Sequence, residues 1–367
     1  MSGQDSAPTH VLVDGYELSA SHHRGIGTYL RHLVDGLADD RDVTLEVLAA
    51  RDVALPPGVR RSPLGRIAAP RWRDQQHARR LPRALRGTEA DVVHTPGRTV
   101  PRRADRPWVH TLHDLTPLVI DHPELAVERD RWRQQGARLR DAHAVITPSH
   151  ATKHAAVEHL GLDPERVVVI PHGVDPHLHA DERPEGVEGP PHLLWVSSWA
   201  PHKGLADAIA VVDRLADRGL PHELRIVGGN DAWMLDRIHE RAAAARHADR
   251  VHVDGWVPDV GAAYRAATAL LVTSRAEGFC FPALEAMACG TPVVAYANTA
   301  ITELVQDVGV LAPDGDVDAM ADAVTRVITD TELSATCAAA GSARAAHLTW
   351  AASVAAHVDV YRGAGSA

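Results

Sequence analysis

The sequence predicts an α/β protein with two Rossmann-like, doubly wound parallel-sheet domains that face a central cleft. The chain has 367 residues, which suits two domains better than one. Apolar runs rich in β-branched residues recur along it, with helical patterns between most of them, as in βαβ units. A polar, proline-rich stretch near the middle interrupts this alternation, and the pattern then restarts.

The first half is expected to supply six strands of one sheet. They are the runs at residues 10–15, 43–49, 91–95, 108–114, 144–149 and 166–171. After Pro171, prolines at positions 176, 184, 190 and 191 leave no room for a helix or a central strand. We therefore predict an N-terminal domain over residues 1–175 and a linker over residues 176–191.

The second half repeats the pattern with six further strands. They are the runs at residues 192–198, 223–229, 250–255, 269–274, 291–296 and 308–312. These define a C-terminal domain over residues 192–348. In doubly wound sheets, ligands bind beyond the carboxyl ends of the strands, so the loops that follow the strands are expected to carry the chemistry.

The composition indicates a globular protein of a reducing compartment. Hydrophobic residues make up 45% of the chain and charged residues 23%. There is no basic-then-apolar leader, and no stretch approaches the roughly 18 apolar residues of a membrane span. The three cysteines, Cys280, Cys289 and Cys337, form no CxxC pair, which disfavours disulfides and structural zinc. A cytoplasmic location is expected, and no nucleic-acid partner.

Charge is unevenly distributed along the chain. The net charge is −10, yet residues 60–106 contain 13 arginines against four acidic residues. This segment could meet an anionic membrane surface, which would make the protein peripheral at the inner membrane face, or a phosphorylated acceptor. The alternative is a solvated, arginine-rich helix face.

A glycine-containing loop is expected after the first strand. Gly25 and Gly27 would allow close approach of a ligand, and a helix beginning near Thr28 would offer free N–H groups to an anion. The stretch lacks the third glycine of the dinucleotide fingerprint, and Glu46 lies in mid-strand, so an NAD site is disfavoured. A loop facing sugar or phosphate is predicted, with a plain flexible turn as the alternative.

Two further strand ends carry candidate side chains. His113 ends an apolar strand and is closely followed by Pro117, so it is expected to project into the cleft. Lys203 precedes an amphipathic helix, where the helix dipole disfavours a cation unless an anion is bound nearby. A structural histidine and a solvated lysine are the alternatives.

Residues 277–294, EGFCFPALEAMACGTPVV, place Glu277 and Glu285 around a helix start. Pro282 suits the first helical turn, and Gly290 suits the position after the helix. The amides before the helix would bind an anion, but the carboxylates would repel one. A phosphate attached to sugars fits both features, because its hydroxyls can donate to the carboxylates.

At this point the chain resembles a known family. Residues 274–305, SRAEGFCFPALEAMACGTPVVAYANTAITELV, are similar to the nucleotide-sugar signature of family 4 glycosyltransferases, retaining enzymes of the GT-B fold. Other stretches match in the family's order: GIGTYLRHLVDGL, HTLHDLTPLVIDHPE, AVITPSHAT, VVVIPHGVD, HKGLADAI and VPDVGAAYRAATALLVTS. The likeness covers nearly the whole chain and points to the bacterial mannosyltransferase-like branch.

The resemblance implies catalytic roles for His113, Lys203 and Glu277. His113 would face the transferred sugar, Lys203 would neutralise the diphosphate leaving group in place of a metal ion, and Glu277 would hold the donor sugar. Glu285 would bind the ribose hydroxyls. A terminal helix over residues 349–367 would return to the N-terminal domain.

Further donor contacts are implied by the same resemblance. The amides of Gly278, Phe279 and Cys280 would hold sugar and phosphates, and the loop with Gly25 and Gly27 would lie over the diphosphate. The nucleotide base would lie near three residues that follow strands: Gly228, Trp256 and Val257.

Three residues depart from the common family pattern within the donor-binding stretches. Ser198 stands where many members carry a second phosphate-binding arginine. Cys280 stands where glycine is common, which predicts ordinary backbone angles there, and Phe281 adds bulk near the sugar. An unusual donor specificity is expected.

The predicted reaction is retaining, metal-independent transfer of a hexose-type sugar from a nucleoside diphosphate sugar to an acceptor hydroxyl. The resemblance implies that the N-terminal domain is the acceptor side, and the acceptor would be a glycan, a lipid-linked glycan or a small natural product. An epimerase or glycan phosphorylase of the same fold, or a non-catalytic two-domain sugar-binding protein, are the alternatives. A metal-dependent transferase would need a DxD motif, but the DGDVD of residues 314–318 is predicted to cap a helix.

Overall fold

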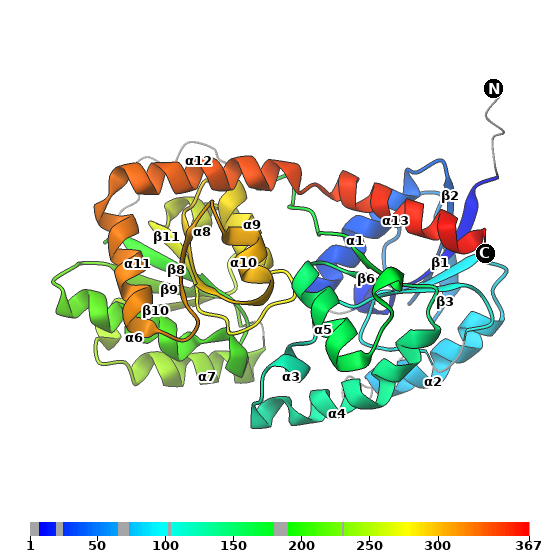
Figure 1. The fold of residues 1–367 in the computed structure, drawn as a ribbon, viewed down its shortest axis with the longest axis horizontal. Coiled ribbons are helices and arrows are strands. Elements are labelled where there is room, and N and C mark those ends of the chain that lie inside the picture. Colours follow the sequence, from blue (N-terminus) through cyan, green and yellow to red (C-terminus); the bar gives the residue numbers. More distant parts are fainter. Residues whose placement is uncertain are drawn as a thin grey trace. The chain divides into compact units, whose positions relative to one another are not determined.

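The computed structural model describes residues 7–19, 25–64, 73–101, 104–179, 190–229 and 231–366. The chain divides into two compact units (Figure 1). Unit 1 comprises Met1–Leu118, Val127–Gly173 and Trp350–Ala367, and unit 2 comprises Val119–Ala126 and Val174–Thr349. Most of the predicted linker lies outside the described residues.

Unit 1 contains a seven-stranded parallel sheet with the order β3-β2-β1-β4-β5-β6-β7. Its strands are β1 (Thr9–Asp14), β2 (Val43–Ala49), β3 (Arg60–Pro63), β4 (Val92–Thr95), β5 (Trp108–Thr111), β6 (Ala144–Thr147) and β7 (Val167–Val169). The six predicted strands are all present. The additional strand, β3, lies at the sheet edge and reads RRSP, so it lacks the apolar pattern of a buried strand.

The helices of unit 1 lie between and after its strands, and the first of them corrects a prediction. They are α1 (Gly25–Ala38), α2 (Arg73–Arg86), α3 (Thr116–Val119), α4 (Ala126–Gln135), α5 (His150–Leu160) and α13 (Trp350–Gly365), and the last residue of α3 and the first residue of α4 belong to unit 2. Short 3-10 turns link some elements: η1 (Tyr16–Ser19), η4 (Gly136–Asp141) and η5 (Pro164–Arg166) in unit 1, and η3 (Pro123–Leu125) in the segment of unit 2 between α3 and α4.

Gly25 and Gly27 lie in the first turn of α1 and not in a loop before it, because the helix begins three residues earlier than expected. Gly27 is buried close to the backbone of η1, and a side chain there would touch the carbonyl of Glu17. The residues that precede α1, 20–24, lie outside the described part of the chain.

Unit 2 contains a six-stranded parallel sheet with the order β10-β9-β8-β11-β12-β13. Its strands are β8 (His192–Val196), β9 (Glu223–Val227), β10 (Val251–Gly255), β11 (Ala269–Val272), β12 (Val293–Ala297) and β13 (Val310–Pro313), as predicted. Its helices are α6 (Leu205–Asp217), α7 (Ala232–Ala243), α8 (Val260–Ala266), α9 (Phe281–Ala288), α10 (Thr299–Val305), α11 (Val317–Thr329) and α12 (Thr331–His347), with 3-10 turns η6 (Pro201–Lys203) and η7 (Ala248–Arg250). The prediction of two doubly wound parallel sheets is confirmed.

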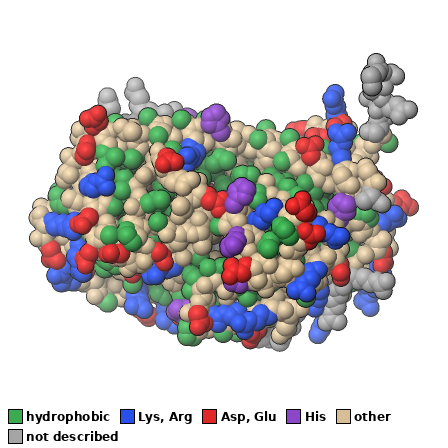
Figure 2. Space-filling model, in the orientation of Figure 1, with side chains coloured by type: hydrophobic (Ala, Val, Ile, Leu, Met, Phe, Trp, Pro, Cys, Tyr) green, Lys and Arg blue, Asp and Glu red, His purple; other side chains and the backbone are tan. Residues whose placement is uncertain are grey.

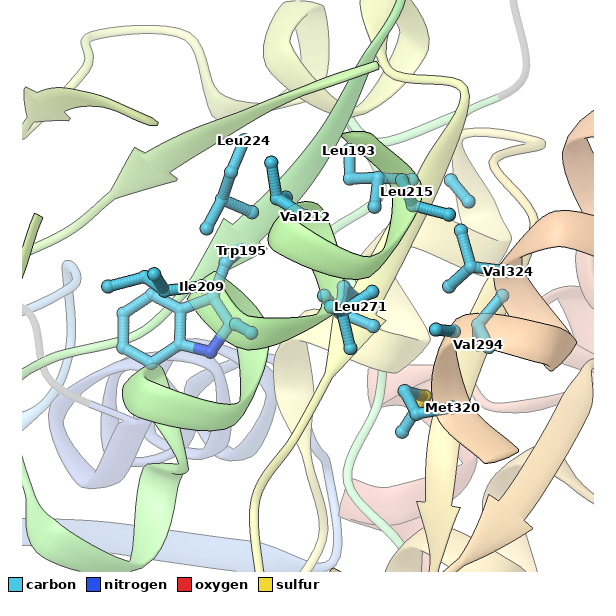
Figure 3. Close-up of a cluster of buried hydrophobic side chains, with 14 of the residues drawn as sticks. Leu193, Trp195, Ile209, Val212, Leu215, Leu224, Leu271, Val294, Met320 and Val324 are labelled. Atoms are coloured by element: carbon cyan, nitrogen blue, oxygen red, sulfur yellow. The ribbon is translucent and has the colours of Figure 1, made fainter. Parts of the chain in front are cut away.

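Both faces of the sheet in unit 2 are buried. On one face, Leu193 and Leu271 of the strands pack with Val212 of α6 and Val324 of α11 (Figure 3). Neighbouring strand residues point the other way, into a second cluster built around α9. Because both faces are covered, the strands read as continuous apolar runs, which is why the sequence revealed them.

The strand order of unit 2 reverses at its centre. From β8 the chain winds outward to β9 and β10, and it then returns to form β11 on the other side of β8. The carboxyl ends of β8 and β11 therefore flank the point where the connecting loops diverge, which is where doubly wound sheets bind ligands. In the described part of the chain, the helices are too short or too polar to span a bilayer.

Candidate active site

The loops after β8 and β11 bring Lys203 and Glu277 together. Lys203 ends the turn η6 that follows β8, and Glu277 follows β11 by five residues. The Lys203 Nζ atom lies 2.7 Å from Glu277 Oε1, and the two side chains are 20% and 13% exposed. Two residues predicted separately as catalytic thus form an ion pair at the strand-order reversal of unit 2.

The backbone of Lys203 is held against the end of β11. Its carbonyl oxygen accepts a hydrogen bond of 3.1 Å from the Thr273 hydroxyl, which itself accepts one of 3.2 Å from the Trp195 indole. Gly204 has a φ of 68°, and a Cβ atom there would lie 2.1 Å from the Thr273 carbonyl oxygen. Only glycine permits this close approach, so the position of Lys203 is fixed from both sides.

The residues between Glu277 and α9 correct a second prediction. Cys280, expected to have ordinary backbone angles, has a φ of 77° and a ψ of 68°. The reason is its place at the helix start, where its carbonyl oxygen accepts the Ala283 and Leu284 amides as the chain turns sharply. Its thiol is buried, which raises the pKa of Cys280 well above the ordinary thiol value.

The neighbouring residues of this loop are also well packed. Gly278 and Phe279 are buried, and the ring of Phe279 meets that of Phe281 edge to face at 5.4 Å. The helix α9 has only eight residues, and Gly290 follows it, as predicted, with a φ of 70°. The loop and the helix start therefore form one closely packed segment after β11.

Glu285 lies one turn inside α9. Its Oε2 atom accepts a hydrogen bond of 2.7 Å from the hydroxyl of Tyr264, a fully buried residue of α8. Burial raises the pKa of Glu285 above its usual range, while the Tyr264 hydrogen bond opposes that rise. Tyr264 fixes the carboxyl group and leaves Oε1 without a protein partner among the described residues.

The predicted base-binding residues lie at the ends of β9 and β10. The Gly228 amide donates to the Gly255 carbonyl at 2.7 Å, and Gly228 has a φ of 125° that brings it against the Ser197 backbone. Trp256 follows Gly255 and is 67% exposed, and Val257 packs against the core of unit 2. Ser198, after β8, is exposed and far less bulky than an arginine.

In unit 1, His113 lies two residues beyond β5 and lines a pocket. Its Nε2–H group donates to the Pro96 carbonyl at 2.8 Å, which leaves Nδ1 as the acceptor nitrogen. Burial lowers the pKa of His113 to about 4, so the ring is neutral near pH 7. The pocket has polar walls from the 97–98 loop and from α4, with these lining side chains: Arg98, Asp114, Glu128, Arg131, Trp132 and Gln135.

Beside His113 lies a buried hydrogen-bond chain that the sequence did not reveal. The Nδ1–H group of His357 donates to the Ser353 carbonyl at 2.7 Å, so its Nε2 atom must accept from the Tyr29 hydroxyl at 2.8 Å. The Tyr29 oxygen is then free to accept from the Thr111 hydroxyl at 2.9 Å. The edge of the Tyr29 ring also contacts the His113 ring, with centroids 4.8 Å apart.

The same chain continues to the far end of α13. Because the Thr111 hydrogen is used, its oxygen accepts from His94 Nε2–H at 2.8 Å, and His94 Nδ1 accepts from the Tyr361 hydroxyl at 2.7 Å. One carbonyl group therefore sets the direction of every hydrogen bond. The chain ties α13 to α1, β4 and β5 across unit 1, and no local sequence pattern signals it, since two of its directly bonded members, Tyr29 and His357, are 328 positions apart.

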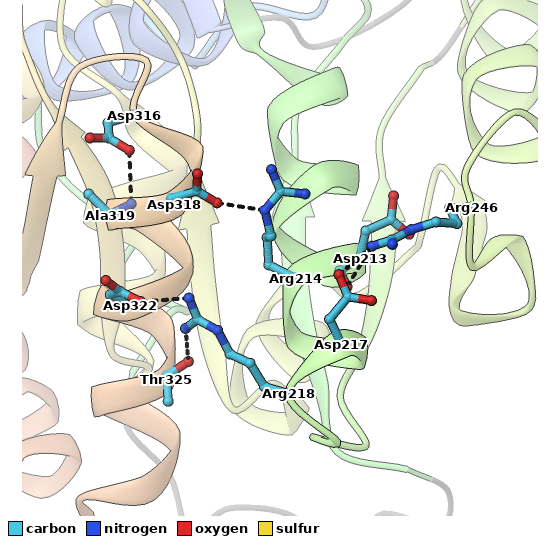
Figure 4. A network of polar contacts seen from close by, with 10 residues as sticks. All are labelled: Asp213, Arg214, Asp217, Arg218, Arg246, Asp316, Asp318, Ala319, Asp322 and Thr325. Carbon is cyan, nitrogen blue, oxygen red and sulfur yellow. Dashed lines mark hydrogen bonds and ion pairs between the residues drawn. The ribbon is translucent and has the colours of Figure 1, made fainter.

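The aspartates of the DGDVD stretch are engaged elsewhere. Asp316 caps α11 by accepting the Ala319 amide at 2.9 Å, as predicted, and Asp318 pairs with Arg214 of α6 (Figure 4). Asp314 lies 3.0 Å from the Arg275 guanidinium. No cluster of three or more His, Cys, Asp and Glu side chains with metal-binding geometry occurs within the described ranges.

The arginine-rich segment is only partly described, since residues 65–72 and 102–103 lie outside the described ranges. Arg61 donates to the carbonyls of Ala50 and Val53, and is thus used in the fold. Among the side chains of α2 that the structure describes, three arginines are exposed: Arg79, Arg83 and Arg86. On the face of the molecule shown in Figure 2, cationic and anionic side chains are interspersed.

Comparisons with known proteins identify the family of the chain. Residues 23–178 match the family model described as Glycosyltransferase Family 4, and residues 190–330 match that described as Glycosyl transferases group 1. A D-inositol 3-phosphate glycosyltransferase of Frankia alni is 32% identical over 303 residues, 74% of each chain. A 2-deoxystreptamine N-acetyl-D-glucosaminyltransferase of Streptomyces fradiae is 33% identical over 254 residues, which are 64% of this chain and 60% of that relative.

Solved structures show the same fold. Sucrose-phosphate synthase from Thermosynechococcus elongatus superposes with a TM-score of 0.81 at 22% identity, covering 97% of this chain and 98% of that one. HepE of Anabaena, solved in complex with UDP and glucose, gives 0.74 at 21% identity, covering 96% and 98%. Two family models and a relative of which 74% is aligned establish that the chain belongs to family 4 (group 1) of the glycosyltransferases, a retaining hexosyltransferase family with the GT-B fold.

Proposed function

We propose that the protein transfers a hexose-type sugar from a nucleoside diphosphate sugar to an acceptor hydroxyl, with retention at the anomeric carbon and without a metal ion. The observation that supports this most directly is the contact of Lys203 with Glu277 at the strand-order reversal of unit 2. A cation and a hydrogen-bond acceptor 2.7 Å apart suit the junction of a phosphate and a sugar.

In this proposal the donor replaces the ion pair by contacts of its own. Lys203 would bind the diphosphate, and Glu277 would then accept hydrogen bonds from sugar hydroxyls. The Gly278, Phe279 and Cys280 amides before α9 would add donors to the phosphates. Glu285, fixed through Oε2 by Tyr264, would offer Oε1 to the ribose hydroxyls.

The proposed chemistry is front-face transfer. The bond from the anomeric carbon to the diphosphate oxygen breaks while the acceptor oxygen bonds to the same face of that carbon. The departing phosphate oxygen takes the proton of the acceptor hydroxyl. Lys203 would stabilise the negative charge that develops on the diphosphate, which is the task of a metal ion in other transferases.

The acceptor is proposed to be a small, polyhydroxylated ring that binds the pocket beside His113. Its walls carry both signs of charge, since Arg98 pairs with Glu128 at 3.1 Å and Asp114 lies beside His113. Such walls suit a ring with hydroxyl and charged substituents, and the indole of Trp132 offers it an apolar face. Relatives whose names refer to 2-deoxystreptamine and D-inositol 3-phosphate indicate cyclitols as the first acceptors to test.

The test is release of nucleoside diphosphate from a panel of nucleotide sugars, with and without 2-deoxystreptamine, inositol 3-phosphate or a lipid-linked glycan. Lys203→Ala and Glu277→Ala should each lower turnover about 100-fold or more with the fold intact. Lys153→Ala is the matched control, because Lys153 is the chain's one other lysine and lies on α5. Wild-type turnover in both active-site variants would sink the assignment.

The same assay separates the alternatives. An epimerase would convert the nucleotide sugar without releasing diphosphate, a phosphorylase would require a glycan and inorganic phosphate, and a binding protein would show thermal protection without turnover. Activity that persists in excess chelator is expected, and its loss would restore a metal-dependent reaction.

A peripheral membrane contact through residues 60–106 is a separate proposal. It is supported by the exposed arginines of α2, Arg79, Arg83 and Arg86. Sedimentation with anionic liposomes should fall when all three are replaced by glutamine, and with rising salt. Equal sedimentation of wild type and triple variant would contradict it.

A further inference from the structure

We propose that Thr299, the first residue of α10, positions Glu277 for the donor sugar through its hydroxyl group. The inference rests on the proposed function, since it assigns Glu277 to the sugar. Thr299 does not itself contact the substrate in this proposal. It acts as a positioning residue that belongs to a different loop of unit 2, the one after β12.

The contact between Thr299 and Glu277 is a direct hydrogen bond. The backbone N–H of Glu277 donates to Thr299 Oγ1 at 2.9 Å, and the Thr299 hydroxyl donates to Asn298 Oδ1 at 3.1 Å. The Asn298 amide nitrogen then donates to the Ser274 carbonyl at 2.9 Å and to Asp314 Oδ1 at 2.7 Å. The loop from Ser274 to Glu277 is therefore tied at both ends to the start of α10.

The backbone of Thr299 shows that this hydroxyl is kept at a cost. Thr299 has a φ of 34°, which β-branched residues rarely adopt and which glycine would adopt freely. Glycine would remove the strain, but it would also remove the acceptor of the Glu277 amide. Threonine at such a position is explained if the hydroxyl has a use that glycine cannot supply.

The Thr299 hydroxyl supports Glu277 but not Lys203. Lys203 is held by Thr273 and by the close approach at Gly204, and neither contact involves Thr299. Loss of the Thr299 hydroxyl should thus displace Glu277 and leave Lys203 in place. Binding of the donor sugar should suffer while binding of the free diphosphate does not.

The test is Thr299→Val, which keeps the β-branched shape and removes only the hydroxyl. We expect kcat/KM with the nucleotide sugar to fall about 10- to 100-fold, while the Kd of the corresponding nucleoside diphosphate changes less than twofold. Thr299→Ser should restore kcat/KM to within about threefold. Thr302→Val is the matched control, because Thr302 lies on the same helix and makes no side-chain hydrogen bond within the described residues.

A second measurement is independent of turnover. Hydrogen exchange of the Glu277 amide should be at least tenfold faster in Thr299→Val than in Thr299→Ser. Unchanged kcat/KM in Thr299→Val, or an equal loss of nucleotide-sugar and diphosphate binding, would overturn the positioning role. Failure of the proposed function looks different, because the wild type itself would then bind no nucleotide sugar.

Discussion

The buried hydrogen-bond chain of unit 1 predicts a large effect of removing a single hydroxyl group. Tyr29→Phe keeps the ring contacts but leaves the His357 Nε2 atom without its donor and the Thr111 hydroxyl without its acceptor. Tyr29, Thr111 and His357 are 0%, 1% and 0% exposed, so water cannot replace the lost partners. At roughly 1–3 kcal/mol for each unsatisfied buried group, the cost is about 3 kcal/mol.

A loss of this size is readily measured. For a unit of about 150–250 residues, 1 kcal/mol shifts Tm by roughly 2–4 °C, so Tyr29→Phe should lower the Tm of unit 1 by about 6–12 °C in calorimetry at pH 7. Tyr296→Phe is the comparison, since its hydroxyl donates only to the part-exposed Asp207 carboxylate at 3.1 Å and should cost about 1 kcal/mol or less. Equal shifts in the two variants would refute the directional chain.

Three further predictions concern pH and backbone conformation. Burial lowers the pKa of His357 to about 4, so as the pH falls the unfolded chain binds the proton before the folded protein does. The free energy of unfolding should therefore fall by up to about 3 kcal/mol between roughly pH 6.5 and 4. Urea titrations should show a smaller pH dependence in His357→Phe than in the wild type. Gly204→Ala places a Cβ atom 2.1 Å from a backbone oxygen, and it should abolish turnover and lower Tm. Gly219 has a similar φ of 74° but open space around it, so Gly219→Ala should lower the free energy of unfolding by only about 1 kcal/mol. Cys280 has a φ of 77°, which glycine adopts without strain, whereas Cys289 has a φ of −78°. In urea unfolding, Cys280→Gly should therefore lower the free energy of unfolding by about 1–2 kcal/mol less than Cys289→Gly does. An equal loss in the two variants would count against strain at Cys280.

The strands were predictable because the sheet period is recorded in neighbouring residues. All twelve predicted runs coincide with strands of the two parallel sheets, and most of their residues are buried. The edge strand β3 was missed, since an arginine-rich run with one strand neighbour needs no apolar pattern. The start of α1 was placed too late because glycine is a weak helix former in the interior but is tolerated in a first turn.

In the candidate site, too, some residues were predictable from the sequence and others were not. Lys203 and Glu277 were found because both follow apolar strands, and parallel strands bring their carboxyl ends to one edge. Their supports were not found, since Tyr264 reaches Glu285 across 21 positions and Thr299 reaches Glu277 across 22. A sequence pattern names the end of a strand, but the groups that fix a side chain there come from other loops.

The backbone strain in unit 2 gives this division a functional sense. Three non-glycine residues among those described have a positive φ: Cys280, Thr299 and Asp307. Asp307 lies in an exposed turn and is of a type that tolerates the left-handed region. Cys280 lies in the loop that begins at Glu277, and Thr299 accepts a hydrogen bond from the Glu277 amide. The intrinsic backbone preference of a residue is thus overridden at the proposed binding site of the donor sugar. Functional sites are where such departures from ordinary backbone preference are expected.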